Sequence, residues 1–169
     1  MQRPQPADYA EYYGLYVGQV PEGNILEVLA GEVRRTAELL ADVPADQETY
    51  RYEAGKWSIR EVLGHIIDTE RLFGYRALSI ARNDPAALPG MDQDVWAASS
   101  NADSRPLAAL LSDLDRARQS SIALFESFDE AMWDRSGIAS DCRFGVRAFP
   151  YIIAGHEIHH RKVLAERYL

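Results

Sequence analysis

The 169-residue chain is short of cysteine, of long apolar runs and of positive charge, and each shortage excludes a class of protein. Cys142 is the only cysteine, so no intrachain disulfide can form and a reducing compartment is expected. No apolar run approaches the roughly 20 residues that a membrane-spanning helix needs. The N-terminal stretch MQRPQPADYAEYYG contains no apolar signal segment. We therefore expect a soluble cytoplasmic protein without a membrane partner.

Basic residues are outnumbered by acidic ones, 18 against 26, which gives a formal net charge of −8. A general nucleic-acid binder needs a basic surface to displace counterions from phosphates, so no nucleic-acid partner is expected. The motifs GxSxG and GxxxxGK[ST] are also missing, which argues against a serine hydrolase elbow and a phosphate-binding loop. A small-molecule substrate fits this composition better.

Four long segments have apolar residues at helical spacing, and none has sustained strand alternation. The first follows Asn24, with Glu27 placed to complete a capping box, and the second follows the matching pair Ser58 and Glu61. The third follows a cap at Ser104. The fourth covers roughly residues 146–167, where a proline at position 150 predicts one lost backbone bond and a slight kink.

This pattern predicts an all-α fold, a four-helix bundle that forms one domain over residues 1–169. Before the first long helix, four tyrosines at near-helical spacing indicate a short helical segment that covers one end of the bundle. They are Tyr9, Tyr12, Tyr13 and Tyr16. The connection between the second and third helices, at about 20 residues, is long for a bundle and could form a crossover or the wall of a site.

Three of the four histidines lie in the short stretch GHEIHH of the fourth helix. At 100° per residue, His156 and His160 lie about 20° on either side of the middle of the apolar face, while His159 lies at its margin. Two buried imidazoles one turn apart can share a divalent metal, because neutral imidazole is a good ligand for zinc and its neighbours. The alternative is a pair of core histidines that are each hydrogen-bonded to a tyrosine or a carboxylate.

A metal site needs a further ligand, and His65 on the second helix is the remaining histidine. It lies on the flank of the apolar stripe of its helix, from which its side chain can lean toward a neighbouring helix. Facing helices build metal sites in bundle cores in this way. His65, His156 and His160 are therefore our candidate metal ligands.

His156, Glu157 and His160 also match the H-E-x-x-H motif of zinc proteases, in which the glutamate is the general base. Only nine residues follow His160, so the usual downstream ligand is missing, and no strand is apparent that could hold a peptide. We interpret the match as a coincidence of helical spacing. Glu157 stays a weak candidate for a base, although the helical wheel places it off the apolar stripe.

Three stretches resemble the DinB-like superfamily, which includes YfiT-type metal-dependent enzymes of bacteria. They are GKWSIREVLGHIIDTERLFGYRAL, followed by LPGMDQDVW, and FPYIIAGHEIHHRKVL. The resemblance implies a four-helix bundle, a divalent metal such as zinc, nickel or iron on His65, His156 and His160, and a homodimer. It also implies thiol-dependent S-transferases or hydrolases among the relatives, and a stress-related history that is no evidence of DNA binding.

From these observations we expect a metal-dependent enzyme that transfers a low-molecular-weight thiol to a small electrophile. The first alternative is a hydrolase that uses metal-bound water as its nucleophile. The second is a non-catalytic, stress-related protein in which the metal is structural. The sequence does not decide among the three.

Overall fold

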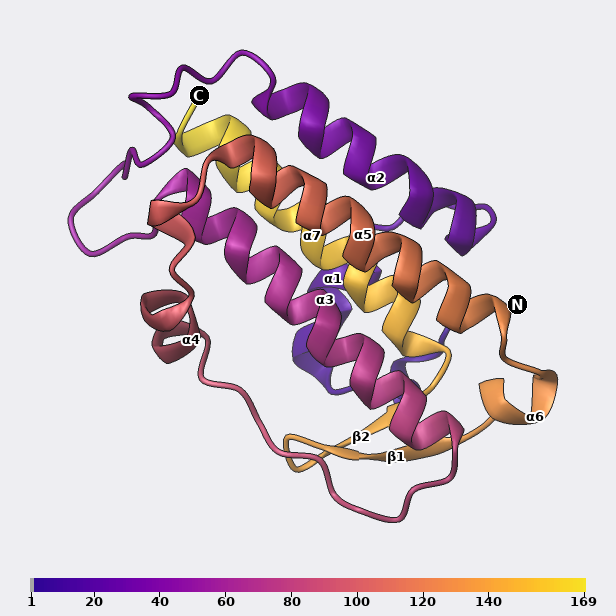
Figure 1. The fold of residues 1–169 in the computed structure, drawn as a ribbon. Coiled ribbons are helices and arrows are strands. Elements are labelled where there is room, and N and C mark those ends of the chain that lie inside the picture. Colours follow the sequence, from indigo (N-terminus) through magenta and orange to yellow (C-terminus); the bar gives the residue numbers. More distant parts are fainter. Residues whose placement is uncertain (1) are drawn as a thin grey trace.

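The computed structural model describes residues 2–169 and contains four long helices that pack as a bundle (Figure 1). They are α2 (Ile25–Leu40), α3 (Ile59–Ala81), α5 (Leu107–Glu126) and α7 (Ala148–Arg167). Each packs against two others, in the cyclic order α2, α5, α3, α7. The predicted four-helix bundle is confirmed. None of the described helices is both long enough and apolar enough to cross a membrane.

Short elements fill the connections. Before α2 lie η1 (Pro6–Asp8), η2 (Glu11–Tyr13) and α1 (Gly14–Val17). Between α3 and α5 lie α4 (Gln93–Ser99) and η3 (Ala102–Ser104). Between α5 and α7 lie α6 (Glu130–Trp133), β1 (Ser136–Ala139) and β2 (Cys142–Gly145).

The caps explain where the long helices begin. Ser58 and Glu61 form the expected capping box at the start of α3, each side chain bonding the backbone N–H of the other. At α2, Asn24 accepts a hydrogen bond from the N–H of Leu26, but the expected box with Glu27 is not formed. The expected cap Ser104 belongs instead to η3, and α5 begins after Pro106, whose fixed φ suits a helix start.

The kink predicted at Pro150 is wrong, because α7 begins two residues later than expected, at Ala148. Pro150 therefore occupies the first turn, where a backbone N–H would have no partner within the helix. The proline removes no helical hydrogen bond there. The two histidines of α7 lie well beyond it, in regular helix.

The connection between α3 and α5 is a crossover, because these neighbours run in the same direction (Figure 1). It returns along the bundle and pairs on its way with the β1–β2 hairpin. Leu88 donates its N–H to the carbonyl of Ile138 at 2.9 Å and accepts from the N–H of Ser140 at 3.0 Å. The hairpin corrects our expectation of no strands. Each strand has only four residues, and the turn is made by Ser140 and Asp141 at positive φ, without the glycine that marks such turns.

The tyrosine-rich segment packs along the side of α7. The prediction that it covers one end of the bundle is therefore wrong. Gly155 permits this close approach, because a Cβ at that position would overlap the carbonyl oxygen of Tyr16. The ring of Tyr16 lies edge-on to His156, with 5.3 Å between the ring centroids. The segment therefore forms one wall beside the candidate site.

A buried polar layer crosses the middle of the bundle and separates two apolar clusters. One cluster contains Phe73 and Phe149 near the hairpin, and the other contains Leu63 and Leu164 near the start of α3. Every long helix contributes to the layer. Its buried members are Glu32, Thr36, His65, Thr69, Glu70, Arg118, Ser121, His156 and Glu157.

Candidate metal centre

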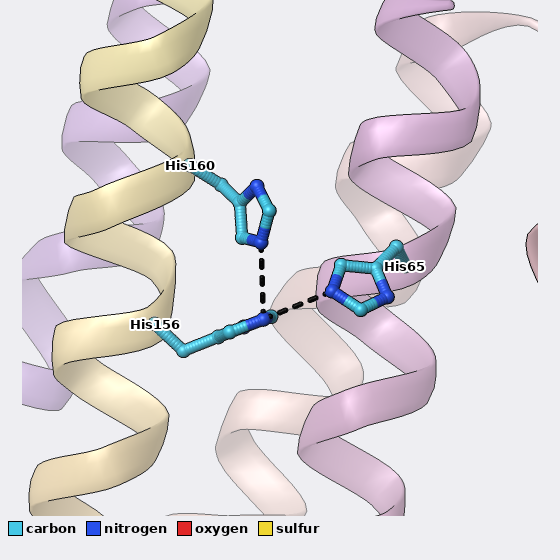
Figure 2. Close-up of side chains that lie close together, drawn as sticks. All are labelled: His65, His156 and His160. Carbon is cyan, nitrogen blue, oxygen red and sulfur yellow. Dashed lines mark hydrogen bonds between the residues drawn. The ribbon is translucent and has the colours of Figure 1, made fainter. Parts of the chain in front are cut away.

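The structure brings the three predicted ligands together in the polar layer (Figure 2). His156 lies between the other two: its Nε2 is 3.0 Å from Nε2 of His65 and 3.1 Å from Nε2 of His160. The candidate ligand atoms all lie within 4.8 Å of one another. Two nitrogens bound to one zinc ion at about 2.1 Å lie roughly 3.0–3.4 Å apart, so the two separations from His156 suit a shared cation.

Helix geometry positions these rings. His156 and His160 are one turn apart on α7, so their side chains lie on the same face. His65 lies on α3, which packs against that face of α7. The indole of Trp57, just before α3, contacts the ring of His65 with 4.7 Å between centroids. The three imidazoles are thus held by packing on two facing helices and an aromatic neighbour.

Burial keeps the triad uncharged. Desolvation lowers the pKa of His65 to about 4. Burial, followed by the proximity of His65 and His159, lowers the pKa of His160 to about 3. Burial and the neighbouring histidines lower the pKa of His156 well below its ordinary value. All three rings are therefore neutral at pH 7, which leaves each with a nitrogen lone pair that can bind a metal.

Hydrogen-bond partners outside the triad are sparse. Thr69 Oγ1 lies 3.5 Å from Nδ1 of His65, one helical turn along α3. A ligand histidine is usually oriented by such a partner at its second nitrogen. Asp68 and Glu70, the acidic neighbours of His65 in the sequence, turn elsewhere: Asp68 pairs with Arg71 and Glu70 with Arg118.

Glu157 does not face the histidines. One of its carboxylate oxygens accepts from Arg118 Nη2 at 2.7 Å, and the other accepts from Thr36 Oγ1 at 2.6 Å. Its side chain is completely buried. With both oxygens engaged away from the triad, Glu157 is not a candidate base, and the H-E-x-x-H match is a coincidence of spacing.

The buried arginine behind Glu157 was not anticipated from the sequence. Arg118 donates Nε and Nη2 to the two carboxylate oxygens of Glu70 at 2.8 and 2.9 Å, and Nη1 to the carbonyl of Leu29 at 2.6 Å. Burial alone would lower the pKa of Arg118, but the two carboxylates outweigh it and raise that pKa. A signal existed: Arg118 is four residues after Leu114 and seven before Phe125, on the apolar stripe of α5.

A cleft of about 370 Å³ opens beside the triad. His160 and Trp57 reach its wall, so the triad lies at the inner edge of the cleft. The hydroxyl of Tyr168 donates to the carbonyl of Trp57 at 2.7 Å and joins the end of α7 to the segment before α3. The other lining residues are Tyr52, Gly55, Lys56, Val62, Gln93, Asp94, His159 and Val163.

Comparisons with known proteins agree with this architecture. Residues 29–164 match the family model described as the DinB superfamily. Among solved structures, the chain is similar to YfiT from Bacillus subtilis, with a TM-score of 0.73 and 16% sequence identity over 98% of this chain and 90% of that one. YfiT is described as a probable metal-dependent hydrolase with an unusual four-helix bundle topology. No curated protein matches the chain.

Proposed function

The chain belongs to the DinB superfamily, and on that premise we propose that it is a metal-dependent enzyme acting on a small molecule. His65, His156 and His160 would hold a divalent transition metal, and the adjacent cleft would hold the substrate. The observation that carries the proposal is the convergence of three neutral Nε2 atoms beside an open cleft. Imidazole ligands suit zinc, nickel and iron.

The tautomers test whether these residues fit a metal. Without one, Nε2 of His156 can either accept one N–H or donate one, so at most one of its two contacts with His65 and His160 is a hydrogen bond and the other is left unsatisfied. With Nε2 of His65 directed at a metal, its proton moves to Nδ1, where the hydroxyl of Thr69 can accept it. The donor set therefore fits a cation.

Thiol transfer is our leading reaction. A bound metal supplies positive charge that stabilises the ionised form of a thiol or of water. No carboxylate of residues 2–169 contacts the triad, and Asp94 on exposed α4 is the sole acidic residue on the cleft wall. A thiol, with an ordinary pKa of about 8.5, needs less help to ionise than water does. The aromatic side chains of Trp57, Tyr52 and Tyr168 can hold the apolar part of an electrophile.

Hydrolysis is the second candidate, and the description of YfiT as a probable metal-dependent hydrolase favours it. In that reaction water would replace the thiol as the nucleophile. Lys56 and Gln93, on the outer wall of the cleft, offer hydrogen-bond donors to a polar substrate in either case. The two reactions differ in whether product formation requires a thiol.

Metal content tests the site itself. Protein purified without added metal should contain close to one divalent ion per chain by elemental analysis, and the His156→Ala/His160→Ala variant should contain almost none. His159→Ala is the matched control, because His159 lies between the two ligands in the sequence but outside the triad, and it should keep its metal. A double variant with unchanged metal content would contradict the proposal.

Activity assays then separate the reactions. A panel of small electrophiles and esters should be incubated with metal-loaded protein, with and without a low-molecular-weight thiol, and the products identified by mass spectrometry. Thiol adducts that form only in its presence support transfer, and products that form without thiol support hydrolysis. If neither appears while chelation lowers the melting temperature, the metal is structural, and the catalytic proposal is wrong.

A further inference from the structure

A second pocket, of about 210 Å³, lies at the opposite end of α7 from the cleft. It is bounded by the N-terminal segment, the region from α6 into β1, and the end of β2 with the residues that precede α7. Arg147, at its wall, is nine residues before His156, which corresponds to about 13 Å along the helix axis. The pocket is therefore separate from the histidine triad.

Four arginines line this pocket, although the chain as a whole is acidic. They are Arg3, Arg135, Arg143 and Arg147. Two carboxylates, Asp8 and Asp134, also reach the wall, so the charged lining carries two more positive than negative groups. An excess of guanidinium groups in a concave site is the arrangement that proteins use to bind phosphate and carboxylate groups.

Two of the arginines make no ion pair within residues 2–169. Arg135 donates to the carbonyl of Ala81, and Arg143 donates to the carbonyl of Ala7 at 3.0 Å and the hydroxyl of Ser136 at 2.9 Å. These partners are neutral. They fix the guanidinium groups in place but do not cancel their charge, and each group keeps further N–H donors for a ligand.

The remaining charges are more nearly balanced. Arg147 pairs with Asp134 at 2.6 Å, and Arg3 pairs with Glu22 at 3.1 Å while donating to two backbone carbonyls. Asp8 accepts from the N–H of Gln5 at 2.8 Å. In the described part of the chain, Arg135, Arg143 and Asp8 are thus the charged groups of the lining without an ion-pair partner, which leaves one net positive charge, carried by the two arginines.

The fold adds a further positive contribution. Arg147, on the pocket wall, is the residue immediately before α7, so the N-terminus of this 20-residue helix lies near the pocket. The N-terminus of a helix carries a partial positive charge that favours anions within its first turn. The pocket volume corresponds to about seven water molecules, which suits a phosphate-sized group and not a whole nucleotide.

From these observations we infer that this pocket binds a small, multiply charged oxyanion, a phosphate or polycarboxylate group, through Arg135 and Arg143. The site is distinct from the proposed metal centre and does not depend on it. Charge-assisted hydrogen bonds from guanidinium groups would hold the ligand, and the helix terminus would add to the attraction.

Calorimetric titration tests this inference, with inorganic phosphate, pyrophosphate and citrate as probes at constant ionic strength. Saturable binding is expected, and the preferred probe distinguishes phosphate from carboxylate ligands. Arg135→Gln and Arg143→Gln should each weaken binding about tenfold or more, the equivalent of one lost charge-assisted bond. Arg116→Gln, at an exposed arginine on α5, is the matched control and should leave binding unchanged.

The His156→Ala variant should bind the same probes as the unmodified protein, which distinguishes this pocket from anion binding at the metal centre. If Arg135→Gln fails to fold, Arg143→Gln alone decides, because Arg143 is exposed and bonds neutral groups only. Absence of saturable binding by any of the three probes would overturn the inference. So would binding that is unaffected by Arg143→Gln, or weakened equally by Arg116→Gln.

Discussion

His156 and Glu157 are consecutive residues of α7 and are both buried in the polar layer, but they differ in how burial of their polar side chains is compensated. Both carboxylate oxygens of Glu157 have partners, because one accepts from Arg118 and the other from Thr36. His156 gives up its charge and meets two other neutral imidazoles at the edge of a cleft. The arginine cluster (Arg118, Glu70, Glu157 and Thr36) is complete without a ligand, whereas the triad directs spare lone pairs at a common point.

Within one layer, the arginine cluster is thus suited to a structural role and the histidine triad to ligand binding. A buried charge that has a full set of partners holds helices in register, and removing one partner is costly. Buried neutral imidazoles contribute little by themselves, but a metal that binds only the folded protein stabilises it by mass action. We therefore expect changes in the arginine cluster to affect folding first, and changes in the triad to affect metal binding first.

The largest effect is expected from Arg118→Met, which leaves Glu70 and Glu157 buried without their cation. Breaking a buried ion pair in this way costs about 3–5 kcal/mol, so the free energy of unfolding by urea should fall by that amount. Arg116→Met is the matched control, because Arg116 forms an exposed ion pair on the same helix and should cost less than about 1 kcal/mol. Equal losses for the two variants would contradict the assignment.

Metal removal should have the next largest effect. A metal present at about 100 times its dissociation constant adds about 2.7 kcal/mol to the stability of the folded state. Dialysis against a chelator should therefore lower the melting temperature of the unmodified protein, and added metal should restore it. The His156→Ala variant should show no such shift, and a shift of the same size in that variant would place the metal elsewhere.

Gly155→Ala should destabilise the protein by about 1–3 kcal/mol, the usual range for overpacking. The added methyl group would overlap the carbonyl of Tyr16 and push the tyrosine-rich segment away from His156. Gly31→Ala on α2 is a matched control, since a Cβ there meets no atom within 4 Å and should be neutral or stabilising. Thermal melts and metal content should be measured for both, and similar stabilities would refute the close approach.

The smallest effect is expected from Thr69→Val, which removes the hydroxyl beside Nδ1 of His65 without changing the shape of the side chain. Loss of such a partner weakens metal binding by about tenfold, at the low end of the usual range, because the 3.5 Å separation is long. Competition with a chromogenic chelator measures the affinity. Ser121→Ala, at another hydroxyl of the polar layer, should leave the affinity unchanged.

Much of the bundle could be predicted from the sequence, because the four apolar stripes have a clear helical period and Ser58 marks the start of α3. The three histidines could be brought together because His156 and His160 share a helical face, and only one other histidine was available to join them. The structure places all three side by side. Their metal, the homodimer and the cytoplasmic location stay predictions.

The features that the sequence did not predict depend on contacts between distant residues, which no local sequence pattern indicates. The hairpin has short strands and a turn without glycine, and it is held partly by Leu88 from the crossover connection. Glu70 is an acidic residue that occupies a stripe position four residues after Ile66, where the apolar pattern predicts no charge. Its burial depends on Arg118, which is 48 residues away in the sequence and pairs with its carboxylate.

The residues of the cleft wall come largely from outside the four long helices. Tyr52, Lys56 and Trp57 lie in the connection before α3, and Gln93 and Asp94 lie on α4 in the crossover. The histidines and the arginine cluster lie on the helices themselves. Natural variation or laboratory evolution could therefore reshape the cleft by changing connections, with the helices that carry the histidines and the arginine cluster left intact.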